Sequence, residues 1–263
     1  MPLQLAPTFA ARLAESSHCL RGLWVCSGSP TAAEIIAGSG CEWVLIDGEH
    51  SPITIEGTLS LLRAVAAYPA TPVVRVPVND TVLIKQFLDL GAQNIMVPMV
   101  HTADEAARAA AAMHYPPRGV RGVGSALARS SRWNLVPGYL PEASSTVSLI
   151  VQIESAEAVE NAAAIARTPG VDALFIGPSD LAASMGMLGE QTHPDVVDRV
   201  TRTIAAAKEA GLPVGVNAFN LAQAREYVAA GVDFVNIGAD VQILAGGAQE
   251  KLRQLQDSPE EES

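Results

Sequence analysis

The sequence predicts a single (β/α)8 barrel, an α/β fold of the TIM-barrel type, and three observations support this prediction. Eight short runs rich in Val, Ile and Leu recur along the 263 residues. The runs are almost continuously apolar, which is typical of parallel strands buried on both faces. Ala-rich segments with helical spacing separate most of them. A barrel of this kind takes roughly 250 residues, so the chain length fits one domain.

The predicted strands alternate with helices whose ends carry recognisable residues. Asn79-Asp80 and the segment 101–105 place polar caps and acidic residues at expected helix starts. Glycines stand just before several strands, where a helix would need a left-handed residue to end; they are Gly40, Gly91, Gly170, Gly211 and Gly231. The predicted strands are 21–27, 43–47, 73–78, 95–100, 148–153, 173–177, 214–218 and 234–238.

Composition and charge limit the classes of function. Residues 1–256 are predicted to form the barrel domain, and the acidic tail 257–263 is predicted to be disordered. The formal net charge of −11, without a basic stripe, argues against nucleic acid or an anionic membrane surface as a partner. No apolar run is long enough for a membrane span, and no secretion signal is present. Three cysteines fit a reducing compartment, so we expect a cytoplasmic protein.

The interval 115–146 departs from the strand–helix rhythm. It is rich in Pro and Arg and is too long for an ordinary connection between a helix and a strand. Loops of this length in compact domains usually have a function. We expect the interval either to cover the mouth of the barrel or to contact another subunit.

Four short motifs follow predicted strands and carry most of the chemistry in the sequence. They are 46–50 (Ile-Asp-Gly-Glu-His), Arg75 within Val-Val-Arg-Val-Pro, 152–154 (Gln-Ile-Glu) and 177–180 (Gly-Pro-Ser-Asp). In a (β/α)8 barrel the carboxyl ends of all strands meet at one mouth, which holds the active site. The motifs are therefore predicted to bring a His, an Arg and several carboxylates close together.

Glu154 and Asp180 are the candidate metal ligands. Each is the polar residue that follows an apolar run, and two carboxylates at a barrel mouth would form an oxygen-rich site. Such a site suits Mg²⁺ or Mn²⁺, with water and substrate as further ligands. The alternative is that each is a loop acid or a helix cap. Exposed backbone N–H groups in the 177–181 turn would bind a substrate carboxylate. A Gly-Pro turn is a weak signal on its own because such turns are common.

Asp47, His50 and Arg75 are the candidate catalytic residues. An Asp three residues before a His could raise the basicity of the imidazole and fix its tautomer. Arg75 lies within an apolar strand, where a charge must be paired or face a polar cavity. It could stabilise an enolate oxygen, form a structural ion pair with Asp47 or Glu49, or do both. Lys85, Lys208 and Lys251 all fall on predicted helices, which disfavours an imine-forming aldolase.

Several of these segments together resemble the HpcH/HpaI aldolase family of metal-dependent, pyruvate-releasing class II aldolases. The resemblance extends from Gly22 to about Ala248, and the Arg-rich string within 115–134 is its most specific part. It implies a barrel of the phosphoenolpyruvate/pyruvate type that cleaves a 4-hydroxy-2-oxo acid to pyruvate and an aldehyde. The segments are 45–50, 72–75, 97–100, 115–134, 151–154 and 175–181.

The resemblance also implies roles for individual residues. Glu154 and Asp180 would bind Mg²⁺ or Mn²⁺, with Co²⁺ as an alternative, and Arg75 would stabilise the pyruvate enolate. His50, paired with Asp47, would act as the general base through a water.

Further residues would bind substrate by the same resemblance. Gln152 would contact pyruvate, the amides of Ser179 and Asp180 would seat its carboxylate, and Trp24 would line the site. A homohexamer, a trimer of dimers with exchanged C-terminal helices, is implied as well.

Two alternative functions are consistent with the sequence. One is a related lyase acting on a CoA thioester, for which the basic segment 118–132 could hold the CoA phosphates. The other is a catalytically inactive barrel that binds a 2-oxo acid. A pure binder would not need the His50 base, which favours the aldolase.

Overall fold

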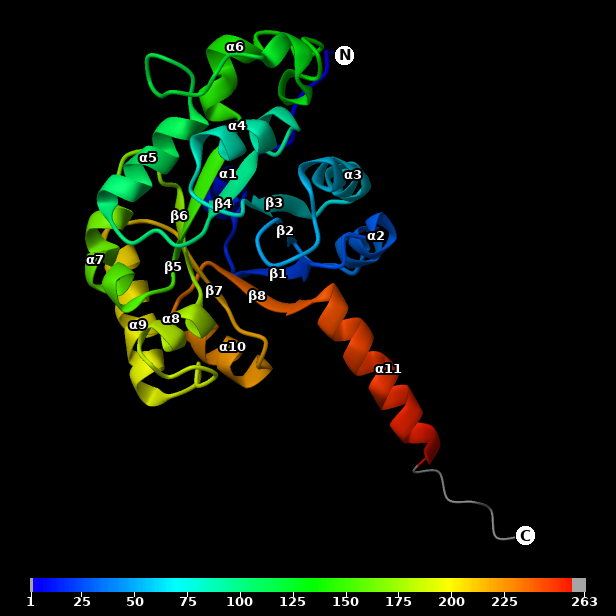
Figure 1. Cartoon of the computed structure of the whole chain (residues 1–263), viewed down its shortest axis with the longest axis vertical. Helices are drawn as coiled ribbons and strands as arrows, with labels where there is room; N and C mark the ends of the chain where they lie inside the picture. Colours follow the sequence, from blue (N-terminus) through cyan, green and yellow to red (C-terminus); the bar gives the residue numbers. More distant parts are fainter. Residues whose placement is uncertain (1, 257–263) are drawn as a thin grey trace.

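The computed structural model, which describes residues 2–256, is a closed barrel of eight parallel strands in the order β1 to β8. Helices cover its outside (Figure 1). The predicted (β/α)8 fold is confirmed. The strands are β1 (Leu20–Val25), β2 (Trp43–Asp47), β3 (Thr71–Arg75), β4 (Asn94–Val97), β5 (Ser148–Ile153), β6 (Ala173–Ile176), β7 (Val214–Asn217) and β8 (Phe234–Ala239).

The helices follow the strands as expected, with one short helix before the barrel. Within residues 2–256, no helix is long and apolar enough to cross a membrane. The helices are α1 (Phe9–Glu15), α2 (Pro30–Gly38), α3 (Ile55–Val65), α4 (Thr81–Asp89), α5 (Ala103–Met113), α6 (Tyr139–Glu142), α7 (Ala156–Ala166), α8 (Pro178–Ser184), α9 (Pro194–Glu209), α10 (Leu221–Ala229) and α11 (Asp240–Gln256).

The strand boundaries agree with the sequence prediction at β2 and β5 and differ elsewhere by a few residues. The largest differences are at β3, predicted as 73–78, and β4, predicted as 95–100. Both strands end early because a proline follows: Pro77 and Pro98 have no N–H to donate to a neighbouring strand. The predicted tail 257–263 lies outside the residues that the structure describes.

Alternation along each strand decides which side chains face the barrel interior. On β2, Trp43 and Leu45 belong to the interior cluster, whereas Val44 and Ile46 pack in the larger cluster with the outer helices. Side chains along a strand point alternately to opposite faces, so Asp47 is the next interior residue and lies at the mouth. The same alternation places Arg75 at the interior end of β3, beside Asp47 in the strand register.

Helix α1 closes the amino-terminal end of the barrel with aromatic side chains. Phe9 packs against Trp43 and Phe234, with ring centroids 5.4 and 5.1 Å apart. The large interior rings fit because small residues face them: a Cβ on Gly22 would overlap the Trp43 indole. The barrel interior below the mouth is thus filled by packed aromatic side chains.

The connection from α5 to β5 lies at the opposite end of the barrel from the mouth, so the predicted lid over the chain's own mouth is wrong. A strand must be entered at its amino end, and this connection leads into β5. The Gln93 side chain, just before β4, donates to the carbonyls of Ala6 and Thr146, both at 3.0 Å. The connection therefore packs on the amino-terminal segment, and a subunit contact remains the open expectation.

Helix α11 differs from the other helices because it projects away from the barrel (Figure 1). After Asp240, all of its residues are exposed, including Leu244 (75%) and Leu255 (78%). Within residues 2–256, nothing covers these apolar side chains.

The close approach at Gly22 generates a stability prediction. A Gly22→Ala variant should lower the free energy of unfolding by about 1–3 kcal/mol, because the added methyl group must displace the fully buried Trp43 ring. Urea unfolding measures the change. Gly246→Ala, at a helical position with no heavy atom within 4 Å of the new Cβ, is the matched control and should lose no stability. Wild-type stability for Gly22→Ala would contradict this packing.

Candidate active site

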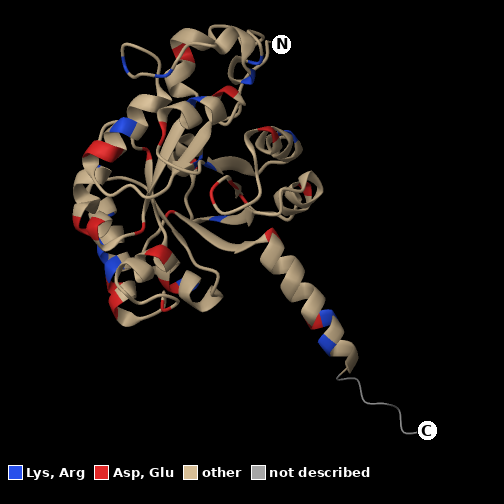
Figure 2. Ribbon diagram, viewed as in Figure 1, with Lys and Arg blue, Asp and Glu red and all other residues tan. Residues whose placement is uncertain are grey.

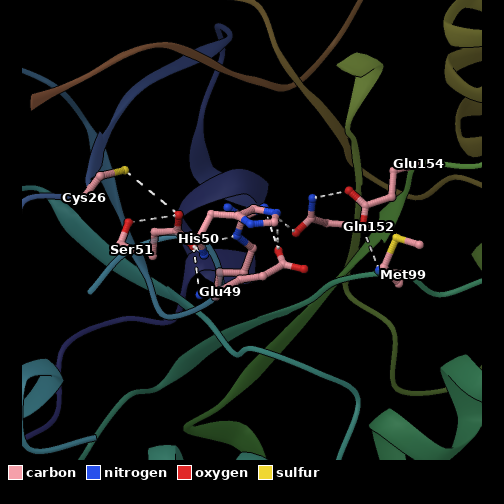
Figure 3. A network of polar contacts seen from close by, with 9 residues as sticks. Cys26, Glu49, His50, Ser51, Met99, Gln152 and Glu154 are labelled. Atoms are coloured by element: carbon pink, nitrogen blue, oxygen red, sulfur yellow. Dashed lines mark hydrogen bonds and ion pairs between the residues drawn. The ribbon is translucent and has the colours of Figure 1, made fainter. Parts of the chain in front are cut away.

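Polar side chains from β2, β3 and β5 meet at the mouth of the barrel and form one connected network (Figure 3). Asp47, Arg75, Gln152 and Glu154 are each at most 3% exposed. The Arg75 guanidinium lies between the carboxylates of one side and the Gln152 amide of the other. The sequence-predicted residues Asp47, Arg75, Gln152 and Glu154 are therefore brought together.

Arg75 contacts two carboxylates. Its Nε donates to Asp47 Oδ1 at 2.9 Å, and its Nη1 lies 2.9 Å from Glu49 Oε2. The second contact is an ion pair without hydrogen-bond geometry, since Glu49 Oε2 has no hydrogen-bond partner. The expected ion pair of Arg75 with Asp47 or Glu49 is thus formed with both.

The Arg75 guanidinium packs against an aromatic ring and has one nitrogen without a hydrogen-bond partner among residues 2–256. The carbon of the guanidinium lies 4.4 Å from the centroid of the Trp24 ring, a cation–π contact. Trp24, which was expected to line the site, is thus in contact with Arg75. The Nη2 atom of Arg75 is buried and has no hydrogen-bond partner in the described residues. A buried, unpartnered donor of this charge is suited to an incoming oxyanion.

Burial and charge shift the pKa values of the two carboxyl groups beside Arg75 in opposite directions. Burial acts to raise the pKa of Asp47, but the Arg75 hydrogen bond and charge outweigh it, and the pKa falls below its usual value. For Glu49, burial dominates over the Arg75 and His50 charges, and its pKa is raised. The lowered pKa keeps Asp47 ionised beside Arg75.

Glu154 lies on the other side of the mouth and is held by two hydrogen bonds. Its Oε1 accepts the Met99 backbone N–H at 2.6 Å, and its Oε2 accepts Gln152 Nε2 at 2.8 Å. A Cβ on Gly177 would come within 2.7 Å of Oε2, so only glycine at that position leaves room for the carboxylate. Burial, with further contributions from Glu49 and Asp180, raises the pKa of Glu154 to about 7.

Met99 is a site residue that sequence reasoning missed. Its φ of 52° lies in the left-handed region, which is unfavourable for a residue with a side chain. That conformation accompanies the backbone N–H contact with Glu154. The only sequence signal is the Pro98 that ends β4, and a proline does not specify the φ of the next residue.

Ser179 and Asp180 lie in the first turn of α8, beyond the end of β6. Both are exposed, and Gly177 is the residue before the helix, with no side chain to cap it. The first backbone N–H groups of a helix lack intrahelical acceptors, so those of Ser179 and Asp180 have no acceptor within α8. Asp180 is close enough to raise the pKa values of both Glu49 and Glu154.

His50 does not pair with Asp47 through its side chain, contrary to the sequence expectation. Asp47 Oδ1 instead accepts the His50 backbone N–H at 3.4 Å, and His50 Nε2 lies 3.7 Å from Glu49 Oε2. The imidazole is 66% exposed. The three-residue spacing brings the backbone of His50, not its ring, to the Asp47 carboxylate.

Residues that follow β1, β2 and β8 also support the mouth. Cys26 and Ser51 approach Asp47 Oδ2, at 4.0 and 3.2 Å (Figure 3). Asp240, the first residue of α11, accepts the backbone N–H groups of Cys26 and Ser27 at 2.8 and 3.1 Å. Asp240 was not predicted, although it follows β8 as the other motifs follow their strands.

The carboxylate side of the mouth fits a hard divalent cation. Glu154, Asp180 and Glu49 repel one another electrostatically, and oxygen donors of this type suit Mg²⁺ or Mn²⁺. Within residues 2–256, no group of three or more His, Cys, Asp or Glu side chains is arranged to hold a metal ion. A cation held by two carboxylates would keep positions for water and substrate.

The fold and the mouth are those of an enzyme on a (β/α)8 barrel, with oxygen donors and a buried arginine at the strand ends. The family described as HpcH/HpaI aldolase/citrate lyase matches residues 20–246, and the chain belongs to this family. The predictions of the family and of an aldolase, a carbon–carbon lyase, are confirmed.

Relatives support the assignment. A 4-hydroxy-2-oxo-heptane-1,7-dioate aldolase of Salmonella dublin is 48% identical over 228 residues, 87% of each chain. The crystal structure of an HpcH/HpaI aldolase/citrate lyase family protein from Burkholderia cenocepacia J2315 has 42% identity and a TM-score of 0.91, covering 94% of this chain and 98% of that one. An HpcH/HpaI aldolase from Desulfitobacterium hafniense DCB-2 has 25% identity and a TM-score of 0.88, covering 97% and 98%.

The raised pKa of Glu154 generates a pH prediction. The protonated Glu154 carboxyl group contributes to the stability of the fold. This contribution is fully present below about pH 4.5 and is lost as the pH rises through about 7. We expect the free energy of unfolding of wild type, measured with a chelator present, to fall between about pH 5 and 8. Relative to the free energy of unfolding of Glu154→Gln, the fall should be about 2–3 kcal/mol. Urea unfolding across this range measures the difference.

A surface glutamate provides the control for this comparison. Glu160 is exposed, and its pKa is lowered by Arg202 and Arg199, so wild type should not lose stability relative to Glu160→Gln as the pH rises. Parallel curves for wild type and Glu154→Gln would show that burial does not disfavour the Glu154 carboxylate.

Proposed function

We propose that this aldolase cleaves 4-hydroxy-2-oxo acids to pyruvate and an aldehyde, with a divalent cation bound by Glu154 and Asp180. The compound 4-hydroxy-2-oxoheptanedioate, which would give succinate semialdehyde, is the first substrate to test because the Salmonella relative is named for it. The observation that carries the proposal is the buried Arg75 with its unpartnered Nη2, next to a carboxylate side suited to a cation.

Arg75 would stabilise the negative charge that develops during bond cleavage. The C4 hydroxyl loses its proton, the C3–C4 bond breaks, and the electron pair moves toward the C2 oxygen as the pyruvate enolate forms. The free Nη2 of Arg75 can donate to that oxygen, and protonation at C3 then gives pyruvate. Groups that interact with charge formed only in the transition state accelerate the reaction.

His50 would accept the C4 hydroxyl proton through a water molecule. Its exposed imidazole is in contact with solvent, and Glu49 lies 3.7 Å from its Nε2. Asp47 would act indirectly, by holding Arg75 and the backbone of residues 49 and 50.

The remaining predicted residues would bind the 2-oxo acid. Gln152 lies between Arg75 and Glu154. The backbone N–H groups of Ser179 and Asp180, in the first turn of α8, could donate hydrogen bonds to the substrate carboxylate. A cation on Glu154 and Asp180 would supply Lewis-acid polarisation of the 2-oxo group. Mg²⁺ and Mn²⁺ suit this oxygen donor set, and Co²⁺ is a further candidate.

The alternative CoA-thioester lyase has less support. Its basic segment 118–132 belongs to the connection at the far end of the barrel from the mouth, as shown by its packing against Asp89 and Leu90 at the end of α4. Within one chain, that segment cannot hold the phosphates of a CoA whose thioester occupies the mouth.

Metal dependence tests the proposed function. Thorough chelation should abolish pyruvate release from a panel of 4-hydroxy-2-oxo acids, and Mg²⁺ or Mn²⁺ should restore it. Glu154→Gln and Asp180→Asn should each lower kcat/KM on the order of 10²–10³-fold, whereas Asp198→Asn, on the exposed face of α9, should not. Full activity of a chelated sample would contradict the metal role, and no pyruvate from any substrate would contradict the reaction.

We further propose that the chain assembles into a homohexamer through α11 and the connection from α5 to β5, inside a reducing compartment such as the cytoplasm. Exposed apolar side chains on both segments support assembly. They are Val123 (66%), Leu127 (89%), Leu135 (64%), Leu244 (75%) and Leu252 (67%). The three cysteines are free, which supports a reducing compartment.

Light scattering coupled to gel filtration tests the assembly. A Leu244→Glu/Leu252→Glu double variant should have a lower mass than wild type, because it introduces charges into an apolar interface. Gln249→Glu, on the same exposed helix, should keep the wild-type mass. Equal masses for wild type and the double variant would show that α11 does not form the interface.

A further inference from the structure

A second polar cavity lies at the closed end of the barrel, away from the mouth. It has a volume of about 370 Å³ and is lined by Arg12, Arg129 and Arg132, and by Thr71 and Asn94 at the starts of β3 and β4. We call it the arginine pocket. Arg75 at the mouth is four residues along β3 from Thr71, a distance of about 13 Å at ordinary strand rise. The arginine pocket is therefore separate from the active site.

The cations of the arginine pocket lack anionic partners. Among residues 2–256, no carboxylate lies within 4.0 Å of Arg12, Arg129 or Arg132, whereas surface arginines such as Arg199 and Arg202 pair with Glu160. A fourth arginine, Arg63, adds to the positive field at Arg129. Basic residues at this end of the molecule are visible near the amino terminus (Figure 2). In a chain with a net charge of −11, this cluster is an exception.

Arg129 and Arg132 converge on one point. A Cβ placed on Gly91 would lie 2.8 Å from the Nη1 atoms of both guanidinium groups. Two like charges held this close repel each other unless an anion neutralises them. Consistent with that repulsion, burial and the neighbouring Arg132 and Arg63 lower the pKa of Arg129 to about 10.

The hydrogen bonds within the chain leave most of the guanidinium donors unused. Arg129 Nη1 donates to the Leu90 carbonyl at the end of α4, and Arg132 Nη1 donates to the Arg129 carbonyl. Capping of α4 explains the first contact. Each guanidinium has five N–H donors, so capping does not account for the others, nor does it involve Arg12.

A strained turn fixes the position of Arg132. Arg132, Trp133 and Asn134 have φ values of 52°, 56° and 65°, three consecutive non-glycine residues in the left-handed region. The buried Ser131 hydroxyl holds the turn by accepting the Asn134 N–H at 2.8 Å. Strain of this kind persists where the surrounding structure maintains it and is often associated with binding.

We propose that the arginine pocket binds a small, doubly charged oxyanion of the phosphate class, either free phosphate or the phosphate group of a small metabolite. Guanidinium forks match the oxygens of such a group and bind it by charge-assisted hydrogen bonds. An oxyanion between Arg129 and Arg132 would also remove their mutual repulsion, and Arg12 would close the pocket from α1.

Calorimetric titration of the full-length protein with inorganic phosphate tests the proposal. Excess pyruvate and Mg²⁺ are kept present so that the mouth is occupied. We expect one phosphate per chain, with binding weakened about tenfold or more in Arg132→Gln and in Arg12→Gln. The Arg12 side chain makes no hydrogen bond or ion pair within residues 2–256, so its substitution leaves the fold intact even if Arg132→Gln unfolds. Arg225→Gln, on the exposed side of α10, is the control and should bind as wild type does.

Two further titrations distinguish the ligand. If glycerol phosphate binds as tightly as inorganic phosphate, the ligand is a phosphomonoester. If glycerol phosphate binds more weakly than inorganic phosphate, the ligand is free phosphate. The proposal is overturned if phosphate does not bind to wild type, if Arg12→Gln binds it equally well, if pyruvate displaces it, or if malonate, a planar dicarboxylate, binds and phosphate does not.

Discussion

The burial of one guanidinium group governs the arrangement of the active site. Arg75 is 2% exposed at the interior end of β3, where water cannot solvate it. A buried charge without partners costs several kcal/mol, so the strand ends around Arg75 must supply anions and acceptors. Asp47 and Glu49 do so from β2 and its loop, each at 2.9 Å, and Gln152 does so from β5. One side chain thereby ties three strand ends together.

The consequence is a mouth with two electrostatic sides. Near Arg75, the pKa of Asp47 is lowered and the carboxylate is ionised. Across Gln152, burial and the repulsion of Glu49 and Asp180 raise the pKa of Glu154 to about 7, and a bound cation would relieve this repulsion. The two sides suit two needs of a reaction on a 2-oxo acid. The guanidinium can stabilise the developing oxyanion, and the oxygen donors on the other side can bind a metal.

The sequence predicts the parts of the site that depend on periodicity and fails where local backbone geometry decides. Continuous apolar runs, and the polar residues at their carboxyl ends, are readable in the sequence, so Asp47, Arg75, Gln152 and Glu154 could be placed at the mouth from the sequence alone. The His50 ring direction depends on a rotamer, which a three-residue spacing does not specify, and the ring lies by Glu49 instead of Asp47. The left-handed Met99 and the convergence of Arg129 and Arg132 on Gly91 arise from backbone strain and long-range packing, for which the sequence has no periodic signal.

The exchange of pyruvate methyl protons in deuterated water tests the central role of Arg75 most directly, because enolate formation is measured without any aldehyde. With Mg²⁺ present, we expect wild type to exchange these protons and Arg75→Gln to exchange them on the order of 10²-fold more slowly, as followed by proton NMR. Exchange at the wild-type rate by a folded Arg75→Gln variant would contradict the assignment of the buried guanidinium to the enolate oxygen.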